Sequence, residues 1–396
     1  MRIAFVSLMG DSPWGGCEVL WTQTAAQALA EGHEVFFSAY QWPQMPEPLL
    51  ALVQNGAHFH PRPRYRPTLS ARLQVRVRQL LQVISPEVAA IRSFKPELIV
   101  VNQGGGHDAL YREDLRDLLL SEQYPYCLTC HSYRDPIRLG EHERSLLIRL
   151  FEGARRVFTI SDQQTAVLQR QLAVRLSNNT IVQNPLNTPA DWPLPFPDMD
   201  GQLVRFASIA SLDADVKGQD TLFEALSSEK WNRRAWELNL YGKGPDKSYL
   251  QRLARYYGIE DRVNFRGYVA DTGAIWALNH VLLLSSRIES GPMVLAEAML
   301  SGRPVVATPV GMVGEWVEEG VTGFIAEASL PHALETALEK CWTQQSRWAA
   351  MGQAATKAAR QRSAADPVGD FLRLITSGQL QAAVGLPEPV RQQSQH

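Results

Sequence analysis

Short apolar runs alternate along the chain with longer stretches of helical periodicity, a pattern typical of parallel strands joined by crossover helices. In the first half the runs are residues 3–8, 34–40, 97–101, 126–130 and 157–160. In the second half they are residues 204–209, 237–241, 263–265, 281–284, 304–308 and 324–326. We therefore expect an α/β protein with two Rossmann-like sheets.

A proline-rich stretch separates the two series of runs. Residues 184–198 read NPLNTPADWPLPFPD, which cannot continue a helix or a central strand. We therefore expect an N-terminal domain over residues 1–186, a linker over 187–200 and a C-terminal domain over 201–365, followed by a last helix and a disordered tail over 366–396. Open parallel sheets bind ligands at the carboxyl ends of their strands, so we expect a site in a cleft between the domains.

Composition narrows the class of protein. A net charge of -2 gives no global reason to expect nucleic acid as a partner. No stretch approaches the ~18 consecutive apolar residues of a membrane span, and the start of the chain lacks a secretory leader pattern, so we expect a cytoplasmic protein. Cys127 and Cys130 have the spacing of a redox or metal pair, but strand positions three apart point to opposite faces. We therefore expect buried thiols and no metal site.

Two carboxylates lie on either side of an expected helix start in the second half. Pro292 suits a first helical turn, which places Glu289 in the loop before the helix and Glu297 within it. The unpaired backbone N–H groups near Met293 and Val294 would point back at this loop, with the positive end of the helix dipole behind them. The arrangement predicts a site for a phosphate beside a polyhydroxylated group.

Glycines and single polar residues follow several other strands. Gly15 and Gly16 follow the first strand but lack the third glycine of a dinucleotide fingerprint, which argues against a nicotinamide enzyme. Lys217 precedes a glycine where a lysine can pair with a phosphate, and a solvated surface lysine is the alternative. His131 opens the loop after the run at 126–130, where a structural and a catalytic role are both open. Further turns, which we interpret as a ligand-facing rim, carry Gly242, Lys243, Gly244, Gly267 and Tyr268.

A basic segment in the first half has two interpretations. It contains no acidic residue and six arginines, which are Arg62, Arg64, Arg66, Arg72, Arg76 and Arg78. It fits a solvated face of the protein, and equally a surface that rests on anionic lipid or receives an acidic acceptor. Peripheral contact with the inner face of a membrane therefore stays open.

Taken in order, these motifs resemble the retaining, nucleotide-sugar-dependent glycosyltransferases of family 4, also called group 1 transferases. The resemblance is strongest between residues 204 and 326. It rests on KG at 217–218, YGKGP at 241–245, RGY at 266–268, Glu289 and Glu297, GRPVVAT at 302–308 and GVTGF at 320–324. The family has the GT-B fold, so the resemblance implies two Rossmann-like domains that face each other across a cleft, and a C-terminal helix that crosses back to the N-terminal domain.

The resemblance also implies roles for individual residues. Glu297 would bind the ribose hydroxyls of the nucleotide, Glu289 the hydroxyls of the donor sugar, and Lys217 the diphosphate. His131 would lie by the donor sugar and the reacting centre. The other residues implied at the nucleotide sugar are Gly15, Gly16, Gly242, Gly267, Tyr268, Gly291, Met293 and Val294. The donor would be a nucleoside diphosphate sugar, with a UDP-sugar favoured, and no metal or other cofactor is implied.

One position departs from the family pattern. Ser211 stands where an arginine usually shares the diphosphate with the lysine, and Arg205 or Lys243 are the candidates to compensate for it. The predicted function is metal-independent, retaining transfer of a sugar to an unidentified glycan, lipid or small-molecule acceptor held mainly by the N-terminal domain. The alternatives are a nucleotide-sugar epimerase on the same fold and a non-catalytic nucleotide-sugar binding protein.

Overall fold

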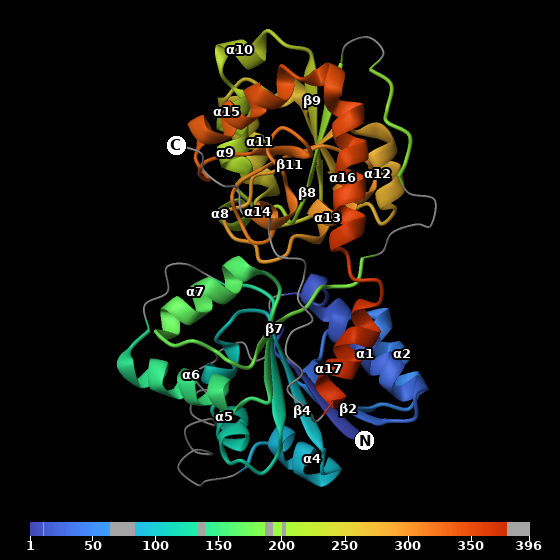
Figure 1. Cartoon of the computed structure of the whole chain (residues 1–396), viewed down its shortest axis with the longest axis vertical. Helices are drawn as coiled ribbons and strands as arrows, with labels where there is room; N and C mark the ends of the chain where they lie inside the picture. The colour runs from blue at the N-terminus through green and yellow to red at the C-terminus, as the bar shows by residue number, and fades with distance from the viewer. Residues whose placement is uncertain (11, 64–83, 134–138, 187–192, 200–202, 378–396) are drawn as a thin grey trace, which may run out of the picture.

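The chain folds into two α/β lobes, seen one above the other in a computed structural model (Figure 1). The structure describes residues 1–10, 12–63, 84–133, 139–186, 193–199 and 203–377. Within these ranges each lobe has one sheet whose strands all pair in parallel. The expected α/β class with two Rossmann-like sheets is therefore confirmed.

The N-terminal lobe is built on a seven-stranded sheet in the order β3-β2-β1-β4-β5-β6-β7. On its central strand, Phe5 lies opposite Phe37 of β2 and Val100 of β4. All three are fully buried because helices cover both faces of the sheet, which is why these strands read as continuous apolar runs. The strands are β1 (Arg2–Ser7), β2 (Glu34–Tyr40), β3 (His58–Arg62), β4 (Leu98–Gln103), β5 (Tyr126–Cys130), β6 (Arg156–Thr159) and β7 (Asn179–Ile181).

The two edge strands of this sheet, β3 and β7, carry no apolar run and are missing from the sequence prediction. β3 reads HFHPR, and β7 has only three residues, NTI. An edge strand pairs on one side only and tolerates polar residues and proline, so its hydrophobic signal is weak. The helices of this lobe are α1 (Gly16–Ala30), α2 (Glu47–Gln54), α4 (Pro86–Phe94), α5 (Glu113–Leu120), α6 (Glu141–Gly153) and α7 (Asp162–Leu172), with a 3-10 turn at Asp108–Tyr111.

The C-terminal lobe has a six-stranded sheet in the order β10-β9-β8-β11-β12-β13. Successive residues of β8 point to opposite faces, so Phe206 packs in one apolar layer and Ala207 in the other. The strands are β8 (Val204–Ile209), β9 (Trp236–Tyr241), β10 (Val263–Gly267), β11 (Val281–Leu284), β12 (Val305–Ala307) and β13 (Gly323–Ile325). The helices are α8 (Ala214–Lys217), α9 (Gln219–Leu226), α10 (Glu229–Asn232), α11 (Lys247–Tyr256), α12 (Thr272–Leu278), α13 (Met293–Leu300), α14 (Val313–Trp316), α15 (Pro331–Trp342) and α16 (Trp348–Arg362), with 3-10 turns at Glu260–Arg262 and Gln345–Arg347.

The last helix, α17 (Pro367–Thr376), returns to the N-terminal lobe and lies beside α1 (Figure 1). Its buried residues Phe371, Leu372 and Ile375 belong to the same core as Phe5 and Phe158. The ring of Phe371 meets that of Phe158 edge-on, with 4.8 Å between the ring centroids. Each such side chain contributes about 1.5–3 kcal/mol when it is buried. The predicted crossing of the C-terminal helix is therefore confirmed.

The chain passes between the lobes twice, and side chains tie the two passages together. The Gln183 side chain donates from Nε2 to the Arg362 carbonyl oxygen at 2.7 Å and accepts at Oε1 from the Ala364 N–H at 2.8 Å. Further along the linker, the buried Arg303 guanidinium donates to the Pro195 carbonyl oxygen at 2.8 Å. It also donates to the Trp276 carbonyl oxygen at 2.6 and 2.9 Å. The arginine of the GRP motif therefore anchors the linker to the C-terminal lobe.

The basic segment of the first half requires a correction at its first residue. Arg62 ends β3 with only 4% of its surface exposed, and it pairs with Glu87 at 2.9 Å. Its guanidinium also lies 4.4 Å from the ring centroid of Tyr40. The prediction of membrane contact through Arg62 is therefore wrong, because the side chain is buried and engaged in contacts inside the protein. Arg64 to Arg78 lie outside the described residues.

The two cysteines of strand β5 lie in the interior of the N-terminal lobe. Cys127 and Cys130 are free and fully buried, and burial raises the pKa of the Cys127 thiol to about 12. Burial raises the pKa of Cys130 as well, so both thiols stay protonated, as expected of structural cysteines.

None of the helices in the described ranges combines the length and apolarity needed to cross a bilayer. The same ranges hold no group of three or more metal-ligating side chains.

Candidate active site

The carboxyl ends of the strands of both lobes meet where the lobes touch. A Cβ placed on Gly16, at the start of α1, would lie 3.4 Å from the Met293 Cε at the start of α13. A Cβ on Gly291 would lie only 2.2 Å from the Ile160 Cγ2. Close by, the Asp162 N–H donates to the Glu315 Oε1 at 3.0 Å. Three predicted site residues, Gly16 of the N-terminal lobe and Gly291 and Met293 of the C-terminal lobe, therefore lie at this junction.

The start of α13 is as expected, with one small difference. Pro292 is the residue before the helix, with φ -64 and ψ 106, rather than part of its first turn. Glu289 lies in the preceding loop and Glu297 within the helix, as the sequence predicts. The N–H groups of Met293 and Val294 open the helix and have no acceptor in it, so they remain available to an anion.

Lys217 and Glu289 form an ion pair, although 72 positions separate them. The Lys217 Nζ lies 2.5 Å from the Glu289 Oε1, and the Ser286 hydroxyl donates to the same oxygen at 3.1 Å. Lys217 is the last residue of α8, and Gly218 follows with φ +64. A Cβ on Gly218 would lie 2.1 Å from the Ser285 carbonyl oxygen, so only glycine lets the lysine turn pack on the end of β11.

Glu297 is a buried carboxylate on the inner face of α13, with 9% of its surface exposed. No described residue forms a hydrogen bond or an ion pair with this carboxylate. Burial raises its pKa from the ordinary 4.5 to about 7. An unpartnered buried carboxylate is costly for the fold and is typical of a group reserved for a ligand.

A threonine and a glycine that sequence reasoning missed support the loop that carries Glu289. The Thr308 hydroxyl donates to the Ser286 carbonyl oxygen at 2.5 Å. Gly311 has φ +54, and a Cβ there would lie 2.3 Å from the Ser290 carbonyl oxygen. Thr308 ends the GRPVVAT motif of the resemblance, but contact with the loop that carries Glu289 depends on the tertiary fold.

The glycines after β9 have a packing role. Gly242 has φ +145, and a Cβ there would lie 1.9 Å from the Ala210 carbonyl oxygen. Gly244 approaches the Leu212 carbonyl oxygen in the same way, at 2.3 Å. Tyr268 is 71% exposed, and Gly267, with φ +73, faces open space. Close backbone packing alone accounts for Gly242 and Gly244, whereas Gly267 and Tyr268 lie at the surface of the rim.

Ser211 is exposed in the loop after β8. The structure distinguishes between Arg205 and Lys243, the two cations that could replace the missing arginine. Arg205 lies near the opposite end of β8 and pairs with Glu237 at 3.2 Å, so its selection as a compensating cation is wrong. Lys243 is exposed in the loop after β9, and its carbonyl oxygen accepts from the Leu212 N–H at 3.1 Å. Lys243 therefore lies beside the Ser211 loop, and Lys217 is a cation that an ion pair with Glu289 already holds in the site.

In the N-terminal lobe, Gly15 and His131 lie at neighbouring strand ends. Gly15 caps α1 with extended backbone, φ -163, and a Cβ there would lie 3.0 Å from the Met9 Cε. The His131 Nε2 lies 2.7 Å from the Asn102 Oδ1. Its Nδ1 is buried and has no hydrogen-bond partner among the described residues. Burial lowers the imidazole pKa to about 3, so His131 is neutral at pH 7.

Glu18 and Asn102 are further polar residues of this junction that sequence reasoning missed. Both are buried, and both belong to the hydrogen-bonded surroundings of His131. Glu18 lies two positions after Gly16, and an acidic residue in an otherwise apolar helix start is the signal that could have identified it. Asn102 gave none, because it ends an apolar strand like many other polar residues.

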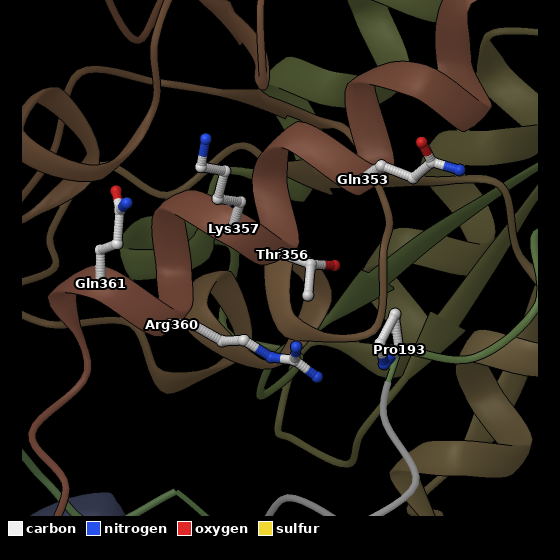
Figure 2. Close-up of a pocket in the computed structure, with 6 residues that line it drawn as sticks. All are labelled: Pro193, Gln353, Thr356, Lys357, Arg360 and Gln361. Carbon is white, nitrogen blue, oxygen red and sulfur yellow. The ribbon is translucent and has the colours of Figure 1, made fainter.

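A pocket of about 410 Å³ lies elsewhere, along α16 beside the linker (Figure 2). Its lining residues are Pro193, Gln353, Thr356, Lys357, Arg360 and Gln361. Figure 2 shows the α16 side chains on one side of this pocket and Pro193 on the other. It contains none of the residues that the sequence assigns to the nucleotide sugar.

Comparison with known proteins finds a family match within the C-terminal lobe. Residues 204–344 match the family described as Glycosyl transferases group 1. N-acetyl-alpha-D-glucosaminyl L-malate synthase of Bacillus anthracis is 37% identical over 91 residues, 23% of this chain and 24% of that protein. A GDP-mannose-dependent alpha-(1-6)-phosphatidylinositol monomannoside mannosyltransferase of Mycobacterium tuberculosis is 32% identical over 170 residues, 40% of this chain and 44% of that protein. The chain thus matches less than half the length of these curated relatives.

Solved structures extend the likeness to both lobes. Anabaena Alr3699/HepE in complex with UDP matches with a TM-score of 0.68 and 19% identity, over 94% of this chain and 98% of that chain. WaaG, a glycosyltransferase involved in lipopolysaccharide biosynthesis, matches with a TM-score of 0.68 and 18% identity, over 95% of this chain and 100% of that chain. The predicted GT-B fold is therefore confirmed, and within the C-terminal lobe residues 204–344 are similar to the group 1 glycosyltransferases.

Proposed function

We propose that the chain is a retaining hexosyltransferase that moves a sugar from a nucleoside diphosphate sugar to an acceptor held mainly by the N-terminal lobe. The observation that carries this proposal is the grouping of Lys217, Glu289 and Glu297 around one helix start, within the segment that matches the group 1 family. Each residue has the chemistry that one part of such a donor requires. Retention and the division of roles rest on the family resemblance.

The diphosphate would lie between Lys217 and the first turn of α13. The N–H groups of Met293 and Val294 and the positive end of the helix dipole favour an anion there. Negative charge gathers on the diphosphate as its bond to the sugar breaks, and fixed positive groups stabilise that charge most in the transition state. This arrangement supplies the stabilisation without a metal ion, so we propose metal-independent transfer.

The sugar and the ribose would use the two carboxylates separately. Glu297 is buried and has no hydrogen-bond or ion-pair partner among the described residues, and the two hydroxyls of a ribose are donors that would satisfy it. Glu289 is held by Lys217 in the structure. A diphosphate that pairs with the Lys217 ammonium would weaken this ion pair and leave Glu289 free to accept from hydroxyls of the donor sugar.

A UDP-sugar is the donor we favour. HepE, which has the same fold, binds UDP and UDP-glucose in its crystal structures. The Mycobacterium tuberculosis relative uses GDP-mannose, so the choice of base is tested by comparing UDP, GDP and ADP in a thermal-shift measurement. The acceptor would be a glycan, a lipid or a small molecule.

Ser211 favours a second candidate function, a non-catalytic nucleotide-sugar binding protein. Its hydroxyl cannot supply the charge of the arginine that usually stands there, and loss of one charged donor to a leaving group costs about 2.7–4 kcal/mol in the transition state. Such a protein would bind UDP but release none from any UDP-sugar, whatever acceptor is present. An epimerase would convert the donor sugar without any acceptor.

Paired variants of the two carboxylates test the transferase directly. We expect Glu297→Ala to weaken UDP binding in calorimetry, because the ribose loses its acceptor. Glu289→Ala is expected to retain UDP binding and to lose transfer of labelled sugar to acceptor pools of glycans, lipids and small molecules. If both variants transfer sugar at the native rate, the assignment of the site is wrong.

A further inference from the structure

A line of buried polar side chains runs from α1 through β4 to His131. Glu18 in the first turn of α1 and Asn102 near the end of β4 are 2% and 1% exposed. The Asn102 Nδ2 lies 3.5 Å from the Glu18 Oε1, and its Oδ1 lies 2.7 Å from the His131 Nε2. The amide of Asn102 thus stands between a carboxylate and an imidazole.

Fixed donors hold the Glu18 carboxylate in place. The Trp21 indole donates to Oε2 at 2.7 Å, and the Ser7 hydroxyl donates to Oε1 at 2.7 Å. An indole N–H can only donate, so Oε2 must accept. Burial raises the pKa of Glu18, whereas the hydrogen bonds from Ser7 and Trp21 act in the opposite direction and favour the ionised carboxylate. The charge of Arg62, which donates to the Ser7 carbonyl oxygen, acts in the same direction as these hydrogen bonds.

The carboxylate decides which way the Asn102 amide points. Its NH₂ end faces Glu18, where the opposite orientation would set a carbonyl oxygen against a carboxylate. The carbonyl oxygen therefore faces His131. An oxygen can only accept, so the His131 Nε2 must carry the ring proton, and Nδ1 is left as the acceptor of the neutral ring.

We propose that Glu18 and Asn102 are positioning residues for sugar transfer, with Glu18 orienting the Asn102 amide and Asn102 fixing both the angle and the Nε2–H tautomer of His131. This inference rests on the proposed function, in which His131 lies by the donor sugar. The buried Nδ1, which has no hydrogen-bond partner among the described residues, is the second observation for it, since an unsatisfied ring nitrogen at a strand end is costly unless a ligand or a domain movement uses it.

An asparagine at this position has a consequence that an aspartate would not have. An aspartate would fix the same tautomer, but its charge would raise the pKa of the imidazole. Asn102 orients the ring without adding charge, and burial keeps the ring neutral. A neutral ring suits the reaction, because positive charge builds on the sugar as its bond to the diphosphate breaks, and an imidazolium beside it would oppose that charge.

Nitrogen NMR of histidine-labelled protein reads the ring itself, with a His131→Gln variant to assign the signal among the nine histidines. In the wild type we expect a neutral His131 with a slowly exchanging proton on Nε2 and an unprotonated Nδ1. In Asn102→Ala that proton should exchange rapidly with solvent. A wild-type ring that is protonated on Nδ1, or charged at pH 7.5, overturns the inference.

Kinetic measurements then distinguish the loss of a positioning role from a general loss of stability. Asn102→Ala and Glu18→Gln should lower kcat for transfer by about 10- to 100-fold, the effect of a misplaced group near the reacting atoms, while the Kd for UDP stays unchanged. The double variant should be no slower than Asn102→Ala alone, because Glu18 acts through Asn102. Full kcat in Asn102→Ala, or additive losses in the double variant, overturns the inference.

Asn178→Ala is the matched control for lost stability. Its side chain donates to the Phe151 and Ala154 carbonyl oxygens at 2.8 and 2.7 Å in the same lobe, away from His131. At a similar fall in melting temperature this variant should retain kcat and the slowly exchanging His131 proton. If it loses kcat as Asn102→Ala does, positioning is refuted. A wild type with the expected ring signal but no transfer from any donor contradicts the proposed function, because the NMR signal tests the hydrogen bonds without the reaction.

Discussion

Replacement of Glu297 by glutamine should stabilise the ligand-free protein while it weakens nucleotide binding. The carboxylate is buried and has no partner in the described part of the chain, and burial raises its pKa from 4.5 to about 7. A raised folded-state pKa means that ionisation opposes folding, so the penalty is absent below about pH 4.5, grows as the pH rises, and is complete above about pH 7. The difference between these pKa values corresponds to about 3 kcal/mol at pH 8, and to less than about 1 kcal/mol at pH 5.

Thermal unfolding of wild type and Glu297→Gln at pH 5 and pH 8 measures this penalty. A lobe of about 200 residues shifts its melting temperature by about 2–4 °C per kcal/mol, so we expect a gain of about 6–12 °C at pH 8 and about 3 °C or less at pH 5. The buried amide keeps some polar cost, so the gain should fall toward the lower end. Saturating UDP should then raise the melting temperature of the wild type more than that of Glu297→Gln.

Glu260→Gln is the control for this measurement. Glu260 lies in the same lobe, in an exposed 3-10 turn, and its replacement should leave the melting temperature unchanged at both pH values. If Glu297→Gln gains nothing at pH 8, or gains as much at pH 5, the carboxylate is not an unpartnered buried charge and the reasoning fails.

Two further substitutions test the phosphate side of the site. Ser211→Arg places in an exposed loop the positive charge that the family pattern has at this position. One charge-assisted hydrogen bond contributes about 1.5–3 kcal/mol, so the variant should bind UDP roughly 10- to 100-fold more tightly in calorimetry. An unchanged Kd for UDP would show that the diphosphate lies elsewhere. Gly218→Ala should lower the free energy of unfolding in urea by more than about 2 kcal/mol and weaken UDP binding, since the added Cβ would lie 2.1 Å from the Ser285 carbonyl oxygen. Gly320→Ala is the control: Gly320 has φ +73 but faces open space, so the loss should be only about 1 kcal/mol. Equal losses in the two glycine variants would mean that crowding at Ser285 is unimportant.

Local patterns predict much of this fold. Apolar runs locate the central strands because helices bury both faces of each sheet, but the edge strand β3 carries two histidines and a proline and gives no such signal. Pro292 correctly separates Glu289 in a loop from Glu297 in a helix, since proline acts on the backbone beside it. The resemblance adds the ligand and the roles, which remain predictions.

Contacts between distant segments account for what the sequence does not predict. Lys217 and Glu289 are each visible as candidates, but their ion pair depends on how α8 packs against the end of β11. Arg62 looks like one arginine of a basic surface, yet β3 carries it beside Glu87 in the interior. In the same way Glu18, Asn102 and His131 come from three different elements, so their hydrogen bonds have no local signature.

A crystal structure of the protein with UDP is the most direct test of the proposed donor site. We predict that the ribose hydroxyls lie within hydrogen-bonding distance of the Glu297 carboxylate, with the diphosphate between the Lys217 Nζ and the N–H groups of Met293 and Val294. UDP bound elsewhere, for example in the pocket along α16, with Glu297 and Lys217 untouched, would contradict it.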